Sequence, residues 1–439
     1  MNRSMSRRAI GLFGALIFAL GGAACASSSG GSDASADAAV VVEDAGSEPD
    51  LGSAPDLGEP PDAGAPPEDA GEVVVDAGVD PDLGVADAGT QTYVDSNGLT
   101  LHQGFKLERY SSVVGARQMA VGADGTVYVG SLNGWVYAIR DADGDGTTAE
   151  EVIQIADGLN RPNGVAVRDG DLYVAEVGRI LVYRDIASQL PTIPTPEVLT
   201  DVYPEDRHHG HKYIAFGPDG MLYVPVGAPC NICDTTEGAI YGNLTRIRAD
   251  GTGLETVAEG IRNTVGFDWH PTSGDLWFTD NNRDNLGDDL PPGELNHVSA
   301  TGQHFGYPWC HGTSIVESSL SETRGCAGYR PPALELQAHV AALGMKFYRG
   351  TMFPERYRGA VIVAEHGSWN RSRKVGYRVM IGTLEGSQVV AYEPFITGWL
   401  NEDTQRASAR PVDMVELADG SLLISDDAGG RIFRLSYDP

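Results

Sequence analysis

The chain has 439 residues, enough for two or three average domains or one large all-β domain, and its formal net charge of −30 is unevenly distributed. Residues 26–93 contain 16 acidic residues and no lysine or arginine, so this segment alone contributes −16. Such a balance argues against nucleic-acid binding, because phosphates would repel the chain, and gives no support for binding to an anionic membrane surface.

The first 25 residues have the pattern of an export signal. Three arginines precede an apolar run from Ala9 to Leu20, which is too short for a convincing transmembrane helix. Small residues then lead to Cys25, as in a lipobox, which predicts lipidation of Cys25 and anchoring to the cell envelope, at the outer membrane or in the periplasm. Gly22 stands where lipoboxes usually have leucine, so secretion after ordinary cleavage is the alternative.

Residues 26–95 repeat short units such as EDAG, PDLG and PDAG. Their apolar residues are mostly alanine and valine, which cannot bury enough surface to offset the entropy lost on ordering the chain. We therefore expect a disordered linker, kept extended by the repulsion of its charges, between the anchor and a folded domain at residues 96–439.

From residue 96 onward the sequence contains six copies of a repeat. Each copy has an apolar strand, a turn and a second apolar strand, as in RQMAVGADGTVYVG from Arg117, and Asp-Gly between alternating apolar residues is a hairpin signal. The other copies begin at Asn163, Tyr213, Val265, Met345 and Val412. No helical periodicity competes, so the sequence predicts an all-β fold, a six-bladed β-propeller. Because propellers have many functions, the activity has to be inferred from the site.

Two segments carry the hard oxygen ligands that calcium prefers. DADGDG, residues 141–146, matches the start of a calcium loop, but position twelve is Val152 rather than glutamate, so a structural ion is plausible and an EF-hand is not. Residues 278–298 form a second cluster of acidic residues and asparagines. For that segment a solvated acidic loop is an equally good interpretation.

The stretch RHHGHKYIAFGPDG places His208, His209 and His211 directly before the innermost strand of the third repeat. In a propeller, such a loop lies at one end of the central channel. A neutral imidazole there suits a general base, because its pKa lies near neutrality. Metal ligands and solvated loop residues are the alternatives, although no carboxylate partner for a metal is evident.

Arg262 and Asn263, in GIRNTVGFDWHP, precede the innermost strand of the following repeat. A guanidinium group beside an amide suits recognition of a carboxylate or a quinone oxygen. The alternative is an arginine that caps loop carbonyl groups.

Apart from Cys25, the chain contains Cys230, Cys233, Cys310 and Cys326. An even number of cysteines in an exported chain indicates disulfides, with three possible connectivities. Short separations favour Cys230–Cys233 and Cys310–Cys326. A redox role for CNIC lacks thioredoxin-like surroundings, and the spacing of the second pair does not suit zinc.

Together the motifs HHGHKYIAFGPDG, CNIC, IRNTVGFDWHP, LWFTDNNRDNLGDDLPPGELNHV and GQHFGYPWCHG resemble the glucose/sorbosone dehydrogenase family of soluble quinoproteins, and the sorbosone-type branch in particular. The resemblance extends from about Phe105 to the end of the chain. This family has a six-bladed propeller, in agreement with the repeat. The resemblance implies oxidation of an aldose or sugar aldehyde with pyrroloquinoline quinone (PQQ) and calcium.

The resemblance also implies roles for individual residues. His209 matches the base that takes the proton of the sugar's anomeric hydroxyl while hydride passes to C5 of the quinone. Arg262 and Asn263 match the pair that contacts the C5 oxygen, and Arg410 matches an arginine that binds cofactor carboxylates. His208 stands where the glucose enzymes have aspartate, so the orientation or pKa of the base can differ here.

For metal binding, the resemblance implies that main-chain carbonyl groups at Gly287 and Asp288 hold the cofactor's calcium, and that Glu294 is a ligand of a structural calcium. The lysine that binds the cofactor in the glucose enzymes is missing near residues 365–368, where His366 or Arg371 are the candidate substitutes.

Two other functions remain open. A calcium-dependent lactonase could hold an ion through Glu176, Asn263 and Asp280, but HHGH would then have no role. The missing lysine, and Val412 in place of a second family arginine, keep open a non-catalytic sugar- or protein-binding propeller. No haem motif is present, so an oxidoreductase of this kind needs a separate electron acceptor, such as a cytochrome, a quinone or a dye.

Overall fold

The computed structural model describes residues 90–235 and 240–439. The predicted signal peptide, Cys25 and the linker up to residue 89 lie outside the described residues. No helix in the described ranges is long and apolar enough to cross a membrane.

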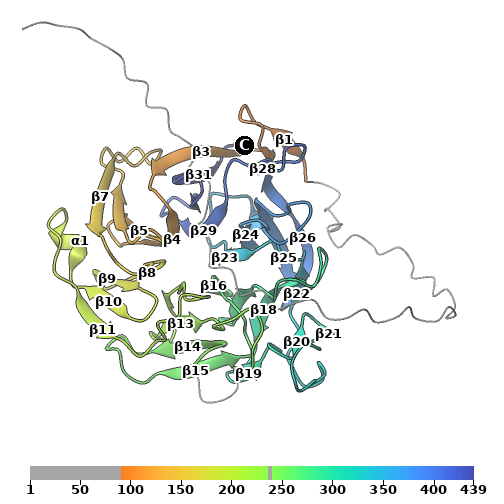
Figure 1. Ribbon diagram of the computed structural model, residues 1–439. Coiled ribbons are helices and arrows are strands. Elements are labelled where there is room, and N and C mark those ends of the chain that lie inside the picture. Colours follow the sequence, from red (N-terminus) through yellow and green to blue (C-terminus); the bar gives the residue numbers. More distant parts are fainter. Residues whose placement is uncertain (1–89, 236–239) are drawn as a thin grey trace, which may run out of the picture. The chain divides into compact units, whose positions relative to one another are not determined.

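Six sheets surround a common axis and form a six-bladed β-propeller (Figure 1), which confirms the fold predicted from the repeat. The innermost strands are the first strands of the six repeats: β4 (Ala116–Val121), β8 (Gly164–Arg168), β12 (Ala215–Phe216), β16 (Phe267–Trp269), β23 (Ala342–Phe347) and β29 (Pro411–Glu416). The second strands are β5 (Val127–Ser131), β9 (Asp171–Ala175), β13 (Leu222–Val226), β17 (Leu276–Asp280), β24 (Val361–Glu365) and β30 (Leu422–Asp426).

The third strands are β6 (Val136–Arg140), β10 (Ile180–Tyr183), β14 (Asn243–Ile247), β18 (Gly293–Val298), β25 (Arg378–Glu385) and β31 (Arg431–Tyr437). The fourth are β7 (Glu151–Ala156), β11 (Glu197–Thr200), β15 (Glu255–Glu259), β22 (Leu334–Leu336), β26 (Gln388–Thr397) and β3 (Phe105–Ser112). Additional elements are β1 (Thr92–Val94) and β2 (Thr100–His102) outside β26, β19 (Gln303–His304) beside β15, the hairpins β20 (Cys310–His311) with β21 (Ile315–Val316) and β27 (Leu400–Asn401) with β28 (Arg406–Ala407), α1 (Ile186–Gln189) and a 3-10 turn at Glu355–Tyr357.

The sixth blade closes the ring by combining distant parts of the chain. Its three inner strands are C-terminal, and its outer strand β3 comes from the N-terminal part of the domain and pairs with β31 in antiparallel register, with Leu107 opposite Leu435. Apolar residues of neighbouring blades pack face to face, as where Met119 and Val129 of the first blade meet Leu423 of the sixth. Each such buried side chain contributes about 1.5–3 kcal/mol.

The order of strands decides where functional loops can meet. Successive strands within a blade are antiparallel, so the loop that enters an innermost strand and the loop that leaves the second strand lie at the same end of the blade. The motifs HHGH and Arg262–Asn263 enter innermost strands, so the fold brings them to one end of the channel.

Candidate functional site

A cavity of about 270 Å³ lies at this end of the channel, between loops of the third, fourth and fifth blades. It is lined by His209, His211, Arg262, Asn263, Asn281, Asn282, Asp284, Pro291, Gly293, His339, Val340, Ala341, Leu343 and Trp369. The structure therefore brings together His209, Arg262 and Asn263, the three residues singled out for chemistry. Arg410 does not line this cavity.

The His209 ring is fixed by a hydrogen bond between its Nδ1 and the carbonyl oxygen of Ala228, at 2.8 Å. A carbonyl oxygen only accepts, so Nδ1 carries the proton and Nε2 keeps its lone pair. Burial, and next the positive charge of Arg262, lower the pKa of His209 to about 2. The residue has a φ of 49°, and its Cβ approaches so closely that a side chain at Gly227 would collide with it, at 2.5 Å. His209 is thus a neutral imidazole whose basic nitrogen makes no hydrogen bond to the described residues.

The other two histidines of the motif differ from His209. His208 is exposed, with its ring centroid 4.0 Å from that of His209. His211 accepts a hydrogen bond at Nε2 from Arg161 Nη1, at 3.0 Å, and burial lowers its pKa to about 3. Among the described residues, no group of three convergent metal ligands includes these histidines. The geometry favours the interpretation as a base over the interpretation as a metal site.

Lys212 follows the motif and was not predicted as a functional residue. Its ammonium group donates to the carbonyl oxygens of Val177 and Gly210, and it lies 5.6 Å from the centre of the Tyr203 ring. Only 2% of the residue is exposed, and burial lowers its pKa to about 8. Lys212 therefore connects the loop of His209 to the second blade. No sequence signal indicates this role, because it depends on which carbonyl groups the fold places nearby.

Arg262 is buried and its guanidinium group joins three loops. It donates to the backbone oxygens of Asn231 and Asn281, to the side chain of Asn231, and to Asp284, each at 2.9 Å. Arg262 therefore caps carbonyl groups, as the predicted alternative had it. The same residue also lines the cavity. Asn231 belongs to CNIC, which explains why that motif accompanies the site.

Asp280 holds the backbone of Arg262 and Asn263. Its two oxygens accept their N–H groups at 2.9 and 2.6 Å, and burial raises the pKa of Asp280 to about 6. Among the described residues, the side-chain amide of Asn263 makes no hydrogen bond. This amide is consequently available to a ligand in the cavity.

Arg410 lies outside the cavity lining. It donates to the carbonyl oxygens of His366 and Gly367 and lies 5.5 Å from the centre of the Tyr377 ring. Within the described residues, neither Arg410 nor Arg161 has a carboxylate within ion-pairing distance of its guanidinium group. Both residues therefore carry positive charge that the surrounding protein leaves unneutralised.

The two residues considered as substitutes for the family lysine are already engaged. His366 Nε2 lies 2.9 Å from Asp427, which also binds Arg117 at 2.8 Å. Arg371 Nη1 donates to the carbonyl oxygen of Asp288 at 2.5 Å.

The carbonyl groups predicted to hold calcium face donors of the protein. The Gly287 oxygen lies 2.9 Å from His339 Nε2, which also lies 3.0 Å from the oxygen of Leu290. The Asp288 oxygen accepts from Arg371. Each of these carbonyl oxygens thus accepts one hydrogen bond and keeps a second lone pair, so calcium binding at Gly287 and Asp288 stays a prediction.

Glu294 lies in a different environment, buried beside Asp280, which is opposite it on the neighbouring strand. Its carboxylate accepts hydrogen bonds from Asn282, Asn296 and the backbone of Gly312, at 2.7–2.9 Å. Burial, and next the charge of Asp280, raise the pKa of Glu294 to about 7. The Oδ1 atom of Asn296 is buried without a hydrogen-bond partner. Carboxylate and amide oxygens are the ligands that calcium prefers, so Glu294 and the Oδ1 atom of Asn296 are the candidate ligands here.

Both disulfides are present in the structure. Cys230 is joined to Cys233 and Cys310 to Cys326, with Cα–Cα distances of 6.1 and 5.1 Å, which is the pairing expected from the short separations.

In the DADGDG segment, ligand oxygens of Asp141, Asp143 and Glu150 lie within 4.8 Å of one another. Glu150, two positions before the Val152 of the calcium-loop pattern, is therefore the third carboxylate of this group and was not predicted.

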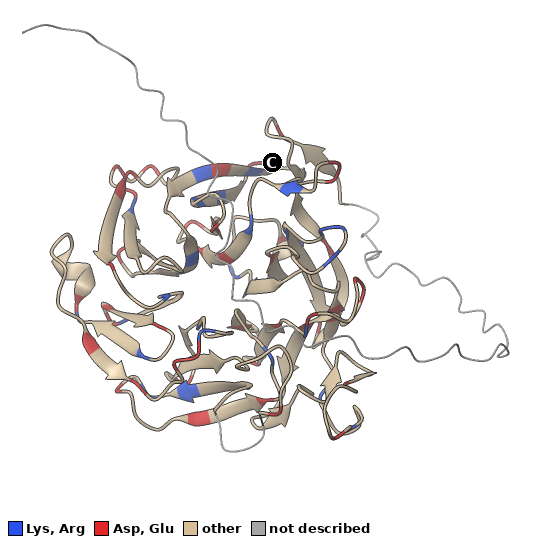
Figure 2. Cartoon of the chain, in the orientation of Figure 1, with Lys and Arg blue, Asp and Glu red and all other residues tan. Residues whose placement is uncertain are grey.

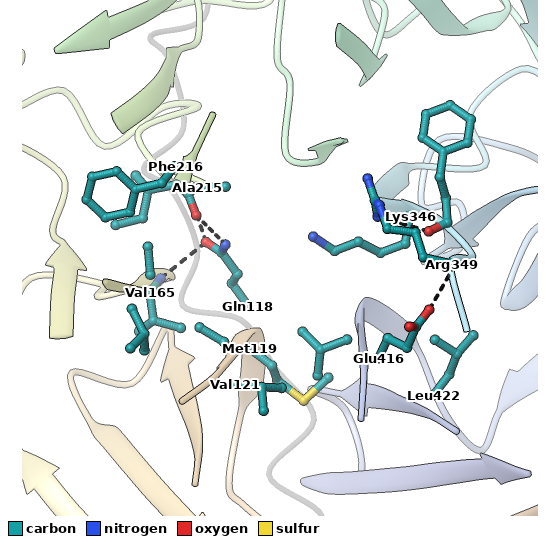
Figure 3. Close-up of a pocket in the computed structure, with 16 residues that line it drawn as sticks. Gln118, Met119, Val121, Val165, Ala215, Phe216, Lys346, Arg349, Glu416 and Leu422 are labelled. Carbon is teal, nitrogen blue, oxygen red and sulfur yellow. Dashed lines mark hydrogen bonds between the residues drawn. The ribbon is translucent and has the colours of Figure 1, made fainter. Parts of the chain in front are cut away.

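A second cavity, of about 320 Å³, lies between the innermost strands (Figure 3). Gln118 bridges two blades there by accepting from Val165 and Ile214, and Arg349 is paired with Asp268. None of the residues predicted for chemistry lines this cavity, so the first cavity remains the candidate site.

Comparison with known proteins places residues 99–438 in a family described as TrAA12-like. An "uncharacterized protein" of Borreliella burgdorferi is 32% identical over 357 residues, which are 77% of this chain and 91% of that protein. A pyrroloquinoline quinone-dependent pyranose dehydrogenase of Coprinopsis cinerea is 27% identical over 183 residues, 38% of this chain and only 21% of that enzyme.

Two solved structures share the fold. The calcium structure of a Trichoderma reesei carbohydrate-active enzyme of family AA12 has a TM-score of 0.67 and 20% identity, over 77% of this chain and 96% of the other. The holo form of the PQQ domain of a C. cinerea pyranose dehydrogenase has a TM-score of 0.64 and 19% identity. The match covers 79% of this chain and 97% of the other.

Proposed function

The chain belongs to the TrAA12-like family, and from that premise we propose that it is an oxidoreductase that oxidises an aldose or sugar aldehyde with PQQ. One observation carries the proposal: the basic nitrogen of His209 lies in the same cavity as Arg262 and the Asn263 amide. The names of relatives support it, since one of them is a PQQ-dependent pyranose dehydrogenase.

The residues present fit such a cofactor. PQQ is an anionic tricarboxylate quinone, and Arg161, which donates to the cavity residue His211, carries positive charge without a carboxylate partner among the described residues. Arg410 lies outside the cavity lining, so its contact with cofactor carboxylates stays a prediction. Arg262 and Asn263 supply a guanidinium group and an amide at the cavity wall. These are the donors that carboxylate and quinone oxygens need.

When bound, the quinone would accept the hydride, and with it both electrons, that a sugar loses on oxidation. The protein's contribution is to move a proton and hold the reactants. His209 takes the proton of the reacting hydroxyl at Nε2, because the Ala228 carbonyl fixes the proton already present at Nδ1. Lys212 and Asp280 fix the loops that carry His209 and Arg262, so the base and the guanidinium group keep their relative positions.

The lactonase alternative has less support. Glu176 is not among the residues that line the cavity with Asn263. The Glu176 carboxylate forms an ion pair with Arg179. It also accepts a hydrogen bond from the backbone N–H of Asn160, at 2.6 Å.

We also propose calcium as a second cofactor, bound at the buried carboxylate of Glu294. The unpartnered Oδ1 of Asn296 and the neighbouring buried carboxylate of Asp280 support this site. Calcium at the carbonyl groups of Gly287 and Asp288 is a further prediction.

The N-terminal pattern and the two disulfides support export of the protein, with lipidation at Cys25. Incorporation of a labelled fatty acid in the wild type but not in Cys25→Ser is the expected result. Secretion of unlabelled wild-type protein would instead indicate ordinary cleavage. The electrons leave to a separate acceptor.

The proposed activity is tested by reconstitution of the purified chain with PQQ, with and without Ca²⁺, followed by dye reduction across a panel of aldoses and sugar aldehydes. We expect sugar-dependent turnover that disappears in His209→Ala. Absence of any PQQ binding in a spectroscopic titration would overturn the proposal and favour a binding propeller.

A further inference from the structure

Trp369 is the one strongly exposed tryptophan among the six of this chain, with 71% of the residue accessible. It lies in the loop between β24 and β25 and lines the cavity of His209. A large apolar side chain gains free energy when it is covered, so an exposed tryptophan at the rim of a cavity indicates a binding surface.

The exposure of Trp369 is set by a loop whose ends are fixed. Arg371 binds the carbonyl oxygen of Asp288 at 2.5 Å and the carboxylate of Asp289 at 3.1 Å, and the backbone of Ser372 donates to Asp288 at 3.0 Å. On the other side, the Tyr377 hydroxyl donates to the backbone oxygen of Ser368 at 2.6 Å. The contacts on both sides hold the indole at the rim.

The size of the cavity determines where a substrate can lie. Its volume of about 270 Å³ is below the roughly 300–1,000 Å³ of most small-molecule pockets. On the proposed function, one flat cofactor fills this space, and the sugar then has to lie at the open mouth. Among the described residues that line the cavity, Trp369 is the only aromatic one other than histidine.

We propose that Trp369 is the surface on which the ring of the sugar substrate stacks. A pyranose presents a face of C–H groups with its hydroxyl groups at the periphery, and the negative face of an indole ring complements such C–H groups. The polar edge of the sugar then faces His209 and the Asn263 amide. A short open-chain aldehyde has no such face, so Trp369 selects cyclic sugars. This inference depends on the proposed function.

The experiment compares the full-length wild type with Trp369→Ala, Trp369→Phe and the matched tryptophan control Trp135→Phe. We expect all four proteins to bind PQQ, and KM and kcat are compared at saturating PQQ. Trp369→Ala should raise the KM for a pyranose substrate about five- to thirtyfold, with kcat little changed, and Trp369→Phe should restore most of the loss. The KM for a short open-chain aldehyde should not change.

A second measurement is independent of turnover. In the loaded and reduced enzyme, a saturating pyranose should protect tryptophan fluorescence from acrylamide quenching. This protection should persist in Trp135→Phe and disappear in Trp369→Phe. An unchanged KM and unchanged protection in the Trp369 variants would overturn the inference and leave the proposed function intact. Failure of the wild type to bind PQQ would overturn both.

Discussion

Replacement of Lys212 by methionine tests the electrostatics of the candidate site. The ammonium group of Lys212 is buried, and among the described residues no carboxylate lies within ion-pairing distance. Two carbonyl oxygens and the Tyr203 ring are its partners. Burial lowers the pKa of Lys212 from 10.5 to about 8, so the folded state disfavours the charged form.

The magnitude follows from the difference between the folded and unfolded pKa. A shift of about 2.5 units, at 1.36 kcal/mol per unit, corresponds to a destabilisation of about 3 kcal/mol while the lysine is charged in both states. Below pH 8 this cost is present in full. Between pH 8 and 10.5 the folded state has lost the proton and the unfolded state still binds it, so the free energy of unfolding rises with pH.

The assay is urea-induced unfolding of the wild type, Lys212→Met and Lys212→Arg at pH 7 to 10.5. Neither methionine nor arginine titrates in this range. The free energy of unfolding of the wild type minus that of each variant should therefore increase between pH 7 and 10.5, by up to about 3 kcal/mol, and by the same amount for both variants. The loss of a donor to Val177 and Gly210 adds a constant cost in the methionine variant, of about 1–3 kcal/mol for each unsatisfied carbonyl. A difference that stays constant from pH 7 to 10.5 would refute the argument.

Three further substitutions test the site. His209→Ala should reduce turnover about 10²–10⁴-fold with PQQ affinity retained, because it removes the base alone; a simultaneous loss of PQQ binding would assign the residue to the cofactor instead. Arg262→Met should lower the free energy of unfolding by about 3–5 kcal/mol, because it removes the hydrogen bonds of a buried guanidinium group and leaves the partly buried Asp284 carboxylate unpaired; urea unfolding at wild-type stability would contradict this. Glu294→Gln should be more stable than the wild type at pH 8 in a chelator, because burial raises the pKa of Glu294 above its ordinary value, and a raised carboxyl pKa destabilises the protein once the pH exceeds it. Added Ca²⁺ should raise the Tm of the wild type and not of the glutamine variant; an equal rise in both would exclude Glu294 as a ligand.

The sequence predicts the propeller well because each blade is a local unit. The Asp-Gly turns and alternating apolar residues of a hairpin lie within about 20 residues of one another, so a pattern can show them. The closure of the sixth blade was not predicted, because β3 pairs with β31 across more than 300 residues and neither strand indicates its partner.

The same distinction applies to the site. The positions of His209, Arg262 and Asn263 before innermost strands were sufficient to place them at one cavity. The contributions of Lys212 and Asp280 could not be predicted, because they depend on which backbone groups the folded loops leave beside them.

The distribution of charge connects the binding and catalytic parts of the proposal. The chain is acidic, and Figure 2 shows acidic and basic residues interspersed around the ring, yet Arg161 and Arg410 have no carboxylate partner among the described residues. Burial and the charge of Arg262 keep His209 neutral, with a pKa too low for an efficient base. Burial is the larger cause of this low pKa and the charge of Arg262 is the second, so an anionic ligand in the cavity opposes only the second cause. On the proposed function, His209 acts as a base only if the bound ligand offsets the Arg262 charge by more than it adds to the burial of the imidazole.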